Sequence, residues 1–199
     1  MSMMRKVALV AWGGLAVLAL LAAGWIYVLE PRLNRSISDS LGHGDYELVT
    51  TDGGTFTQRT LDGGPTAVFF GFAHCPEVCP TTLGDIGVWQ DILAEEGLGP
   101  IRTFFVTVDP ERDTPEMLGD YVSWVEGVTG VSGSPEEIDK AIRAFRVYAR
   151  RVPLEDGGYT MDHSSMVLLF DEDGRFFEPI GYQEDTDRAV GKIRRLLSG

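Results

Sequence analysis

The sequence predicts an α/β fold in which helices cover both faces of a central sheet, with a single apolar helix ahead of it. Three observations support this class. The runs 67–72 and 103–108 are uncharged and typical of strands buried on both faces. The sequences Thr-Pro-Glu at Thr114 and Ser-Pro-Glu at Ser134 are typical of helix N-termini. The chain has 199 residues, enough for one globular domain and a short appendage.

The appendage is an apolar segment near the N-terminus. No charged residue occurs from Val7 to Leu29, and these 23 positions would form a helix about 34 Å long, enough to cross a ~30 Å hydrocarbon core. Arg5 and Lys6 precede the segment, which predicts that 1–6 stay in the cytoplasm and the rest is exported. A cleaved signal peptide is one alternative, although the segment is long for one and bulky Trp25 follows its small residues. A buried core helix is the other.

The sequence therefore predicts four segments: a cytoplasmic N-terminus (1–6), a transmembrane anchor (7–29), a polar tether (30–45) and a folded domain (46–199). The N-terminus is too short for an organelle transit peptide, which favours a single-pass protein of the bacterial inner membrane with its C-terminal domain in the periplasm. After position 35 the chain carries 13 Lys/Arg against 29 Asp/Glu. This balance disfavours nucleic acid as a partner and is compatible with a basic protein surface.

Within the domain, strands and helices are expected to alternate before a final strand pair and helix. The expected strands are 47–50, 55–58, 67–72, 103–108, 127–133, 165–170 and 175–180. The expected helices are 80–96, 114–125, 134–151 and 185–197, and 152–159 is a glycine-rich excursion with the character of a hairpin.

The only two cysteines, Cys75 and Cys79, lie between a buried strand and the start of a helix. Backbone N–H groups at a helix start favour the thiolate, which is both the nucleophile and the metal-binding form of cysteine. The spacing is one residue longer than the Cys-x-x-Cys of disulfide exchange, and if the turn is helical, i and i+4 place both sulfurs on one face. The pair is thus expected to bind one ion or to form a disulfide. A purely structural disulfide is the alternative, but so short a ring would constrain the unfolded chain little.

Three histidines occur, and His163 is the candidate ligand because it comes just before the strand 165–170. In a thioredoxin-like sheet this loop lies beside the cysteine turn, where thioredoxins place a cis-proline; here the nearest preceding proline is Pro153. A core or capping role for His163 is the alternative. His43 is expected to be solvated in the tether. His74 follows the strand and is expected to tune the site electrostatically.

Two thiolates and one imidazole form a soft donor set that favours Cu(I) and, with a further weak ligand, accepts Cu(II). A structural zinc site would more often have four protein ligands. Copper held by Cys75, Cys79 and His163 is therefore expected. Asp162 is a candidate for orienting His163, with an exposed aspartate beside a strand as the alternative.

Three stretches resemble the Sco/SenC family of copper proteins, which assist assembly of the dinuclear copper centre of respiratory oxidases. They are Gly71–Pro80 with its Cys-Pro-x-x-Cys-Pro core, Val106–Glu116, and Asp162-His163-Ser164. The three stretches occur in the same order as in the family, and the resemblance extends over about residues 46–197. The resemblance implies a thioredoxin-like domain, with the two cysteines and the histidine matching the family's copper ligands.

The second stretch contains two further candidates, Asp109 and Asp113. Asp109 is a candidate for supporting the metal site, although the resemblance does not state its role. A helix cap at Asp113 or Thr114 is the structural alternative for this stretch.

The leading expectation is a membrane-anchored copper metallochaperone that delivers copper to oxidase subunit II and need not be an enzyme, although the resemblance permits an enzymatic role as well. Other periplasmic copper carriers and thioredoxin-like reductants are further expected partners. The alternative is a thiol-disulfide oxidoreductase in which Cys75 and Cys79 are catalytic and reduce the copper-ligand cysteines of the oxidase subunit. A copper or redox sensor also remains open. A thiol peroxidase is disfavoured, because Ala73 and His74 stand where such enzymes usually have threonine and proline.

Overall fold

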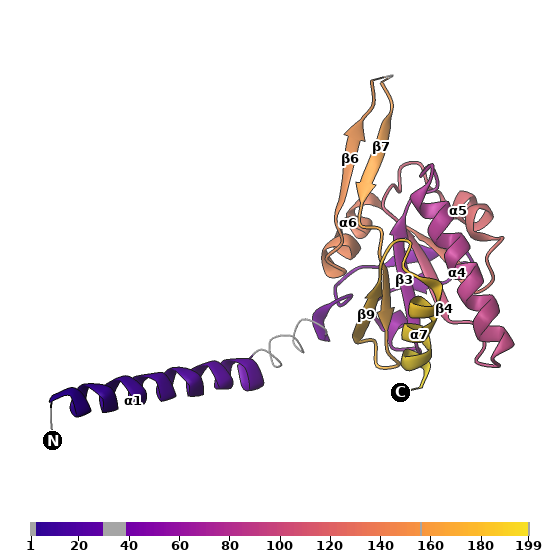
Figure 1. Cartoon of the computed structure of the whole chain (residues 1–199). Coiled ribbons are helices and arrows are strands. Elements are labelled where there is room, and N and C mark those ends of the chain that lie inside the picture. The colour runs from indigo at the N-terminus through magenta and orange to yellow at the C-terminus, as the bar shows by residue number, and fades with distance from the viewer. Residues whose placement is uncertain (1–2, 30–38, 156, 199) are drawn as a thin grey trace. The chain divides into compact units, whose positions relative to one another are not determined.

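The computed structural model describes residues 3–29, 39–155 and 157–198, which divide into two compact units, Met1–Asp39 and Ser40–Gly199 (Figure 1). In the first unit, α1 (Met3–Gly24) continues into a π-helical turn, η1 (Trp25–Leu29). Within the described part of the chain, no helix is long and apolar enough to cross a membrane. The transmembrane helix expected over 7–29 is therefore not confirmed.

The second unit begins at Ser40, inside the range 30–45 expected to be a tether. Leu41 is buried in the core, and the N–H of Gly42 donates a 2.9 Å hydrogen bond to the carbonyl of Ala144. His43, expected to be solvated, is half-buried. Residues 40–45 therefore belong to the folded unit, whereas 30–38 lie outside the described residues.

A seven-stranded sheet forms the centre of the second unit, in the order β2-β1-β5-β4-β3-β8-β9. Its strands are β1 (Leu48–Thr50), β2 (Thr55–Phe56), β3 (Thr66–Gly71), β4 (Arg102–Thr107), β5 (Val128–Ser132), β8 (Val167–Phe170) and β9 (Phe176–Ile180). β3, β4 and β5 are parallel, and β8 and β9 complete that side in antiparallel pairing. β6 (Ala149–Pro153) and β7 (Tyr159–His163) pair only with each other and form a hairpin that projects from the sheet (Figure 1).

Helices pack on both faces of this sheet, as the sequence predicts. They are α3 (Gln58–Leu61), α4 (Val78–Glu95), α5 (Pro115–Val122), α6 (Pro135–Ala144) and α7 (Thr186–Leu197). Every residue of β3 is buried, and its side chains alternate between the faces. Phe70 contacts Phe145 at the end of α6, with ring centroids 5.1 Å apart, whereas Phe69 contacts Phe105 on the other face, where α4, α5 and α7 lie.

One predicted helix is too long: α6 ends at Ala144 and does not reach Arg151. The N–H of Val147 donates to the carbonyl of Ile142 at 3.1 Å, and Arg146 adopts a left-handed conformation with φ 52°. This is a Schellman ending, in which glycine usually holds the left-handed position. Because an arginine occupies it here, the sequence contains no stop signal, and the residues that follow form β6.

Candidate metal centre

The cysteines lie where β3 leads into α4. Cys75 is half-buried in the turn, and Cys79 is the second residue of α4 and fully buried. Both are free thiols, and the backbone N–H of Cys79 donates a hydrogen bond of 3.3 Å to the Sγ of Cys75. The helix start therefore places an N–H donor on the first sulfur, as predicted, although the helix begins two residues before Pro80.

Gly71, the last residue of β3, makes room for the second sulfur. A Cβ at this position would lie 2.7 Å from the Sγ of Cys79 and 2.7 Å from the ring of Phe105. Real Cβ atoms do not approach other atoms so closely, so only glycine lets the thiol pack directly against the strand.

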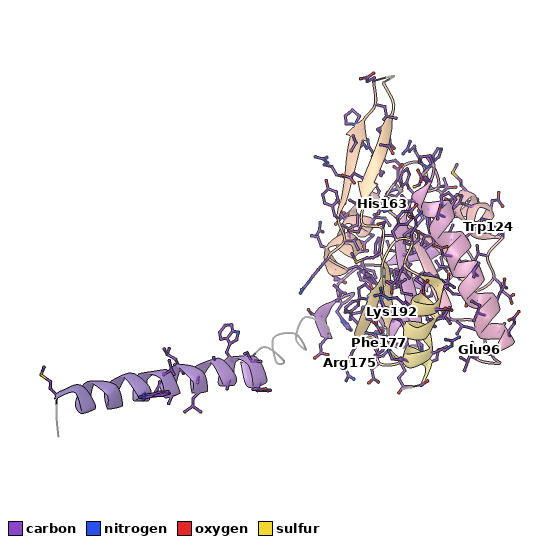
Figure 2. The ribbon with its side chains drawn as sticks, in the orientation of Figure 1. Glu96, Trp124, His163, Arg175, Phe177 and Lys192 are labelled. Carbon is purple, nitrogen blue, oxygen red and sulfur yellow. The ribbon has the colours of Figure 1, made fainter. Side chains whose placement is uncertain are left out.

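His163 is the last residue of β7 and lies at the base of the hairpin (Figure 2). Its Nε2 lies 3.7 Å from the Sγ of Cys79, and its Nδ1 lies 2.8 Å from the carbonyl oxygen of Ser164. Because a carbonyl can only accept, Nδ1 carries a proton and donates it, so Nε2 is the ring nitrogen that faces the sulfurs. When protonated, Nε2 can donate to a thiolate, and when deprotonated it offers a lone pair to a metal ion. Phe72 packs edge-on against the imidazole with ring centroids 5.6 Å apart, which further restricts its orientation.

The sulfurs of Cys75 and Cys79 and a ring nitrogen of His163 all lie within 4.8 Å of one another. A pocket lined by Cys75, Pro76, Glu77 and His163 gives access from solvent to Cys75 and His163. Two thiolates and one imidazole are soft donors suited to copper. The residues present therefore fit copper, and the predicted set is brought together.

The two thiols are electrostatically unequal. Hydrogen bonds from the Cys79 thiol, from His163 and from backbone N–H groups lower the pKa of Cys75 from 9.0 to about 4, against the opposing effect of burial. The same thiol–thiolate hydrogen bond, together with burial, raises the pKa of Cys79. Burial by itself lowers the pKa of His163, but hydrogen bonds to the Cys75 thiolate and the Ser164 carbonyl outweigh it and raise the pKa.

Two polar neighbours named from the sequence lie outside this group. Asp162 is exposed, and strand alternation directs it away from the face that carries His163; its carboxylate lies 3.9 Å from Arg150 on β6. The Nδ1 of His74 lies 3.7 Å from the carboxylate of Asp113. The structure thus shows no contact through which Asp162 orients His163.

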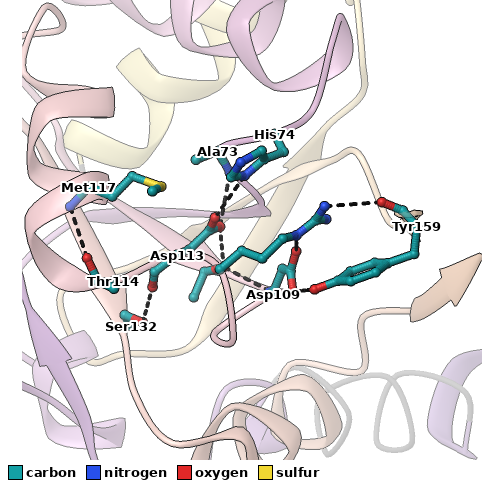
Figure 3. A network of polar contacts seen from close by, with 10 residues as sticks. Ala73, His74, Asp109, Asp113, Thr114, Met117, Ser132 and Tyr159 are labelled. Carbon is teal, nitrogen blue, oxygen red and sulfur yellow. Dashed lines mark hydrogen bonds and ion pairs between the residues drawn. The ribbon is translucent and has the colours of Figure 1, made fainter. Parts of the chain in front are cut away.

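Asp109 and Asp113 are both buried in the loop after β4 (Figure 3). The Oδ2 of Asp113 accepts hydrogen bonds from the N–H of Ala73 at 3.0 Å and from the hydroxyl of Thr107 at 2.6 Å. Burial raises the pKa of Asp113. Of the two capping alternatives, it is Thr114 that caps α5, since its hydroxyl accepts from the N–H of Met117.

Sequence reasoning missed the partners of Asp109. Its carboxylate accepts from the hydroxyl of Tyr159 at 2.9 Å and from the Nε of Arg112. Arg112 also donates through Nη1 to the carbonyl of Tyr159 at 3.1 Å. A buried carboxylate requires such partners, and an arginine three residues later in the same motif was the available signal.

Comparison with known proteins identifies the family. The SCO1/SenC family model matches residues 35–198. The SCO1 homolog 1 of Arabidopsis thaliana is 32% identical and covers 94% of this chain, and the SCO2 homolog of Danio rerio is 36% identical and covers 83%. Both are mitochondrial proteins, and the matches span 62% and 61% of their lengths, so this chain corresponds to less than two thirds of either.

Solved structures agree with this match. Bradyrhizobium japonicum ScoI with copper bound is 39% identical, with a TM-score of 0.69, over 77% of this chain and 99% of that one. Yeast Sco1 with copper bound is 31% identical, with a TM-score of 0.73, over 80% and 90%. BsSco, a member of the Sco family of cytochrome c oxidase assembly proteins, shares the fold at 22% identity and a TM-score of 0.61, over 80% and 96%. The chain therefore belongs to the SCO1/SenC family, whose members include copper-binding proteins of cytochrome c oxidase assembly.

Proposed function

We propose that this protein is a copper metallochaperone that holds one copper through Cys75, Cys79 and His163 and delivers it to the dinuclear copper centre of respiratory oxidase subunit II. The observation that carries the proposal is the approach of the three donors to within 4.8 Å, with Nε2 of His163 directed at the sulfurs. Related structures that contain copper support the choice of metal.

The unequal exposure of the ligands suits a transfer protein. Cys79 is fully buried, whereas Cys75 and His163 line the pocket that opens to solvent. A thiolate of an acceptor protein would reach the copper from the side of Cys75 and replace the protein ligands one at a time, so that the ion passes between two soft sites. The carbonyl of Ser164 keeps the imidazole oriented while the acceptor approaches.

Copper stoichiometry and affinity of the purified, reduced full-length chain test this function. We expect one copper per chain, with binding weakened at least tenfold in His163→Ala because one of three ligands is lost. His43→Ala is the matched control, since His43 lies in the folded unit but outside the donor group, and its affinity should equal that of the native chain. Equal affinities of the native chain and His163→Ala would exclude this site.

A thiol-disulfide oxidoreductase is the second candidate, favoured by the low pKa of Cys75 beside a buried second thiol. The Cys75 thiolate would attack a disulfide of the oxidase subunit and release one partner thiolate. Cys79 would then lose its proton, attack Cys75 in the mixed disulfide and release the second partner thiolate. The partner gains two electrons, and this chain ends with a Cys75–Cys79 disulfide.

These two functions differ in their need for the histidine. Reduction of the oxidised subunit should persist in His163→Ala, and Cys79→Ser should accumulate the mixed disulfide because the resolving thiol is absent. If His163→Ala abolishes oxidase assembly in cells while thiol exchange is untouched, copper delivery is the required activity and the reductase candidate fails.

We also propose a location in the bacterial inner membrane, with residues 46–199 in the periplasm. The uncharged run 7–29 that follows Arg5 and Lys6 supports it. A reporter that is active only in the periplasm, fused after Gly199, should be active, and alkaline extraction of membranes should not release the chain. An inactive reporter, or release by alkali, would refute this location.

A further inference from the structure

The hairpin that carries His163 forms no strand pairing with the central sheet. β6 and β7 pair only with each other, from Ala149 opposite His163 to Pro153 opposite Tyr159. A two-stranded hairpin is marginally stable on its own, so its contacts with the rest of the folded unit must set its orientation. Cys75 and Cys79 lie on a different segment, and the position of His163 relative to them therefore depends on those contacts.

The first of these contacts is made at Tyr159, the opening residue of β7 (Figure 3). Its hydroxyl donates to the buried carboxylate of Asp109, and its carbonyl accepts from Arg112. The Arg112 guanidinium lies 3.8 Å from the centre of the tyrosine ring, and that of Arg151 lies 4.0 Å from it. Arg151 is itself paired with Glu111 at 2.6 Å. The tyrosine ring is thus held between two cations, each tied to the loop after β4.

A second path links the same arginine to the imidazole through the ring of Phe72. The Arg112 guanidinium lies 6.0 Å from the ring of Phe72, and Phe72 packs edge-on against His163 at 5.6 Å. Arg112 therefore contacts the start of the strand that ends in His163 and also the aromatic ring that fixes the imidazole plane. Tyr159 and His163 are four steps apart along the paired strand, a distance of about 13 Å.

We infer that Arg112 and Tyr159, joined through Asp109, are positioning residues that hold the imidazole of His163 beside the sulfurs of Cys75 and Cys79. This inference rests on the proposed copper function and adds to it the residues that keep the third ligand in place. None of the three belongs to the donor group, which consists of Cys75, Cys79 and His163. Groups that orient metal ligands in this way typically change metal affinity about 10–100-fold when removed.

The test compares copper affinity in the reduced full-length chain for Arg112→Met, Tyr159→Leu and Tyr159→Phe. We expect the first two to lose affinity about 10–100-fold and the Cu(II)-loaded forms to lose nitrogen hyperfine coupling in electron paramagnetic resonance. Tyr159→Phe should lose less, because the ring stays between the two guanidinium groups while only the hydroxyl bond disappears. Arg150→Met is the matched control, an exposed arginine on the same hairpin, and should bind copper as the native chain does.

A double-mutant comparison separates positioning from general destabilisation. If Arg112 acts through His163, adding Arg112→Met to a His163→Ala chain should cost no further copper affinity, and in that same background it should leave the rate of Cys75–Cys79 disulfide formation unchanged. Additive losses, or native affinity in Arg112→Met, would overturn the inference while leaving the copper function intact. Native affinity in His163→Ala would overturn both.

Discussion

The backbone N–H of Ala73 donates a 3.0 Å hydrogen bond to the carboxylate of Asp113, forty positions further along the chain. This bond ties the cysteine turn to the loop after β4. The same loop holds the hairpin through the contacts of Asp109 and Arg112 with Tyr159. The motif Val106–Glu116 thus contributes no residue to the donor group of Cys75, Cys79 and His163. It nevertheless contacts both segments that carry these residues, the cysteine turn and the hairpin (Figure 3).

Replacement of Asp113 tests the first of these ties. Asp113→Ala removes the acceptor of the buried Thr107 hydroxyl and of the Ala73 N–H, so we expect the free energy of unfolding to fall by about 1–3 kcal/mol. Asp113→Asn keeps one carbonyl oxygen for both donors and removes a buried charge, so it should cost less. Urea unfolding measures both, with Asp120→Ala on the exposed side of α5 as the control. Equal losses of unfolding free energy in the two Asp113 variants would show that the hydrogen-bond acceptor at this position does not account for the stabilisation.

A methyl group at Gly71 should disturb the copper site directly. The new Cβ would lie 2.7 Å from both the Cys79 sulfur and the Phe105 ring, and such overpacking typically costs about 1–3 kcal/mol. Because the sulfur must move, we expect Gly71→Ala to lower copper affinity as well as stability.

Gly87→Ala is the matched control for that change. Its Cβ would meet only Val125, at an ordinary 3.8 Å, and alanine within α4 should stabilise the helix by about 0.5–1 kcal/mol. Copper titration and urea unfolding of the two variants give the comparison. Unchanged copper affinity in Gly71→Ala would mean that Cys79 does not need its close packing against β3.

The features that the sequence predicted well are those encoded locally. The uncharged run that became β3 is buried on both faces, and the capped starts at Thr114 and Ser134 open α5 and α6. Cys75 and Cys79 could be placed because a strand ends just before them and a helix begins between them. His163 required the additional step of knowing which loop a thioredoxin-like sheet brings beside that turn.

What could not be predicted depends on contacts between distant residues. Arg112 and Tyr159 are 47 positions apart and meet only because the tertiary fold brings the hairpin against the loop after β4. β6 itself lacks strand alternation, since Arg150 and Arg151 are consecutive and both exposed. Asp162 was assigned to the site from its adjacency to His163, but neighbours on a strand point to opposite faces.

The unusual ending of α6 leads to a further prediction. Arg146 holds a left-handed conformation that costs a residue with a Cβ roughly 1–2 kcal/mol more than glycine. Arg146→Gly should therefore raise the free energy of unfolding by up to about 1 kcal/mol, reduced by loss of its exposed hydrogen bond to Ser40. Arg143→Gly, inside the same helix, should lower it by a similar amount. Thermal unfolding distinguishes these outcomes, and a loss of stability in Arg146→Gly would contradict the Schellman assignment.

The low pKa of Cys75, about 4, predicts how the metal-free thiols react. An ordinary thiol with a pKa near 8.5 is alkylated about tenfold faster for each pH unit up to that value, because only the thiolate reacts. Cys75 should instead react with iodoacetamide at a nearly constant rate from about pH 6 to 8, since it is already ionised there. In Cys79→Ala, which lacks the thiol that donates to Cys75, the rate should again rise over this range. A native rate that rises throughout would refute the lowered pKa.

The same ionisation should appear in stability. Because the folded pKa of Cys75 is lowered from 9.0 to about 4, the folded chain binds fewer protons than the unfolded chain between these values. The contribution of Cys75 is therefore fully present near pH 9 and is lost as the pH falls toward 4. Above pH 9 the raised pKa of Cys79 acts in the opposite direction, since the folded chain keeps a proton that the unfolded chain releases. The difference in free energy of unfolding between the native chain and Cys75→Ser should thus grow from pH 4 to 9, and a constant difference would show that Cys75 stays protonated.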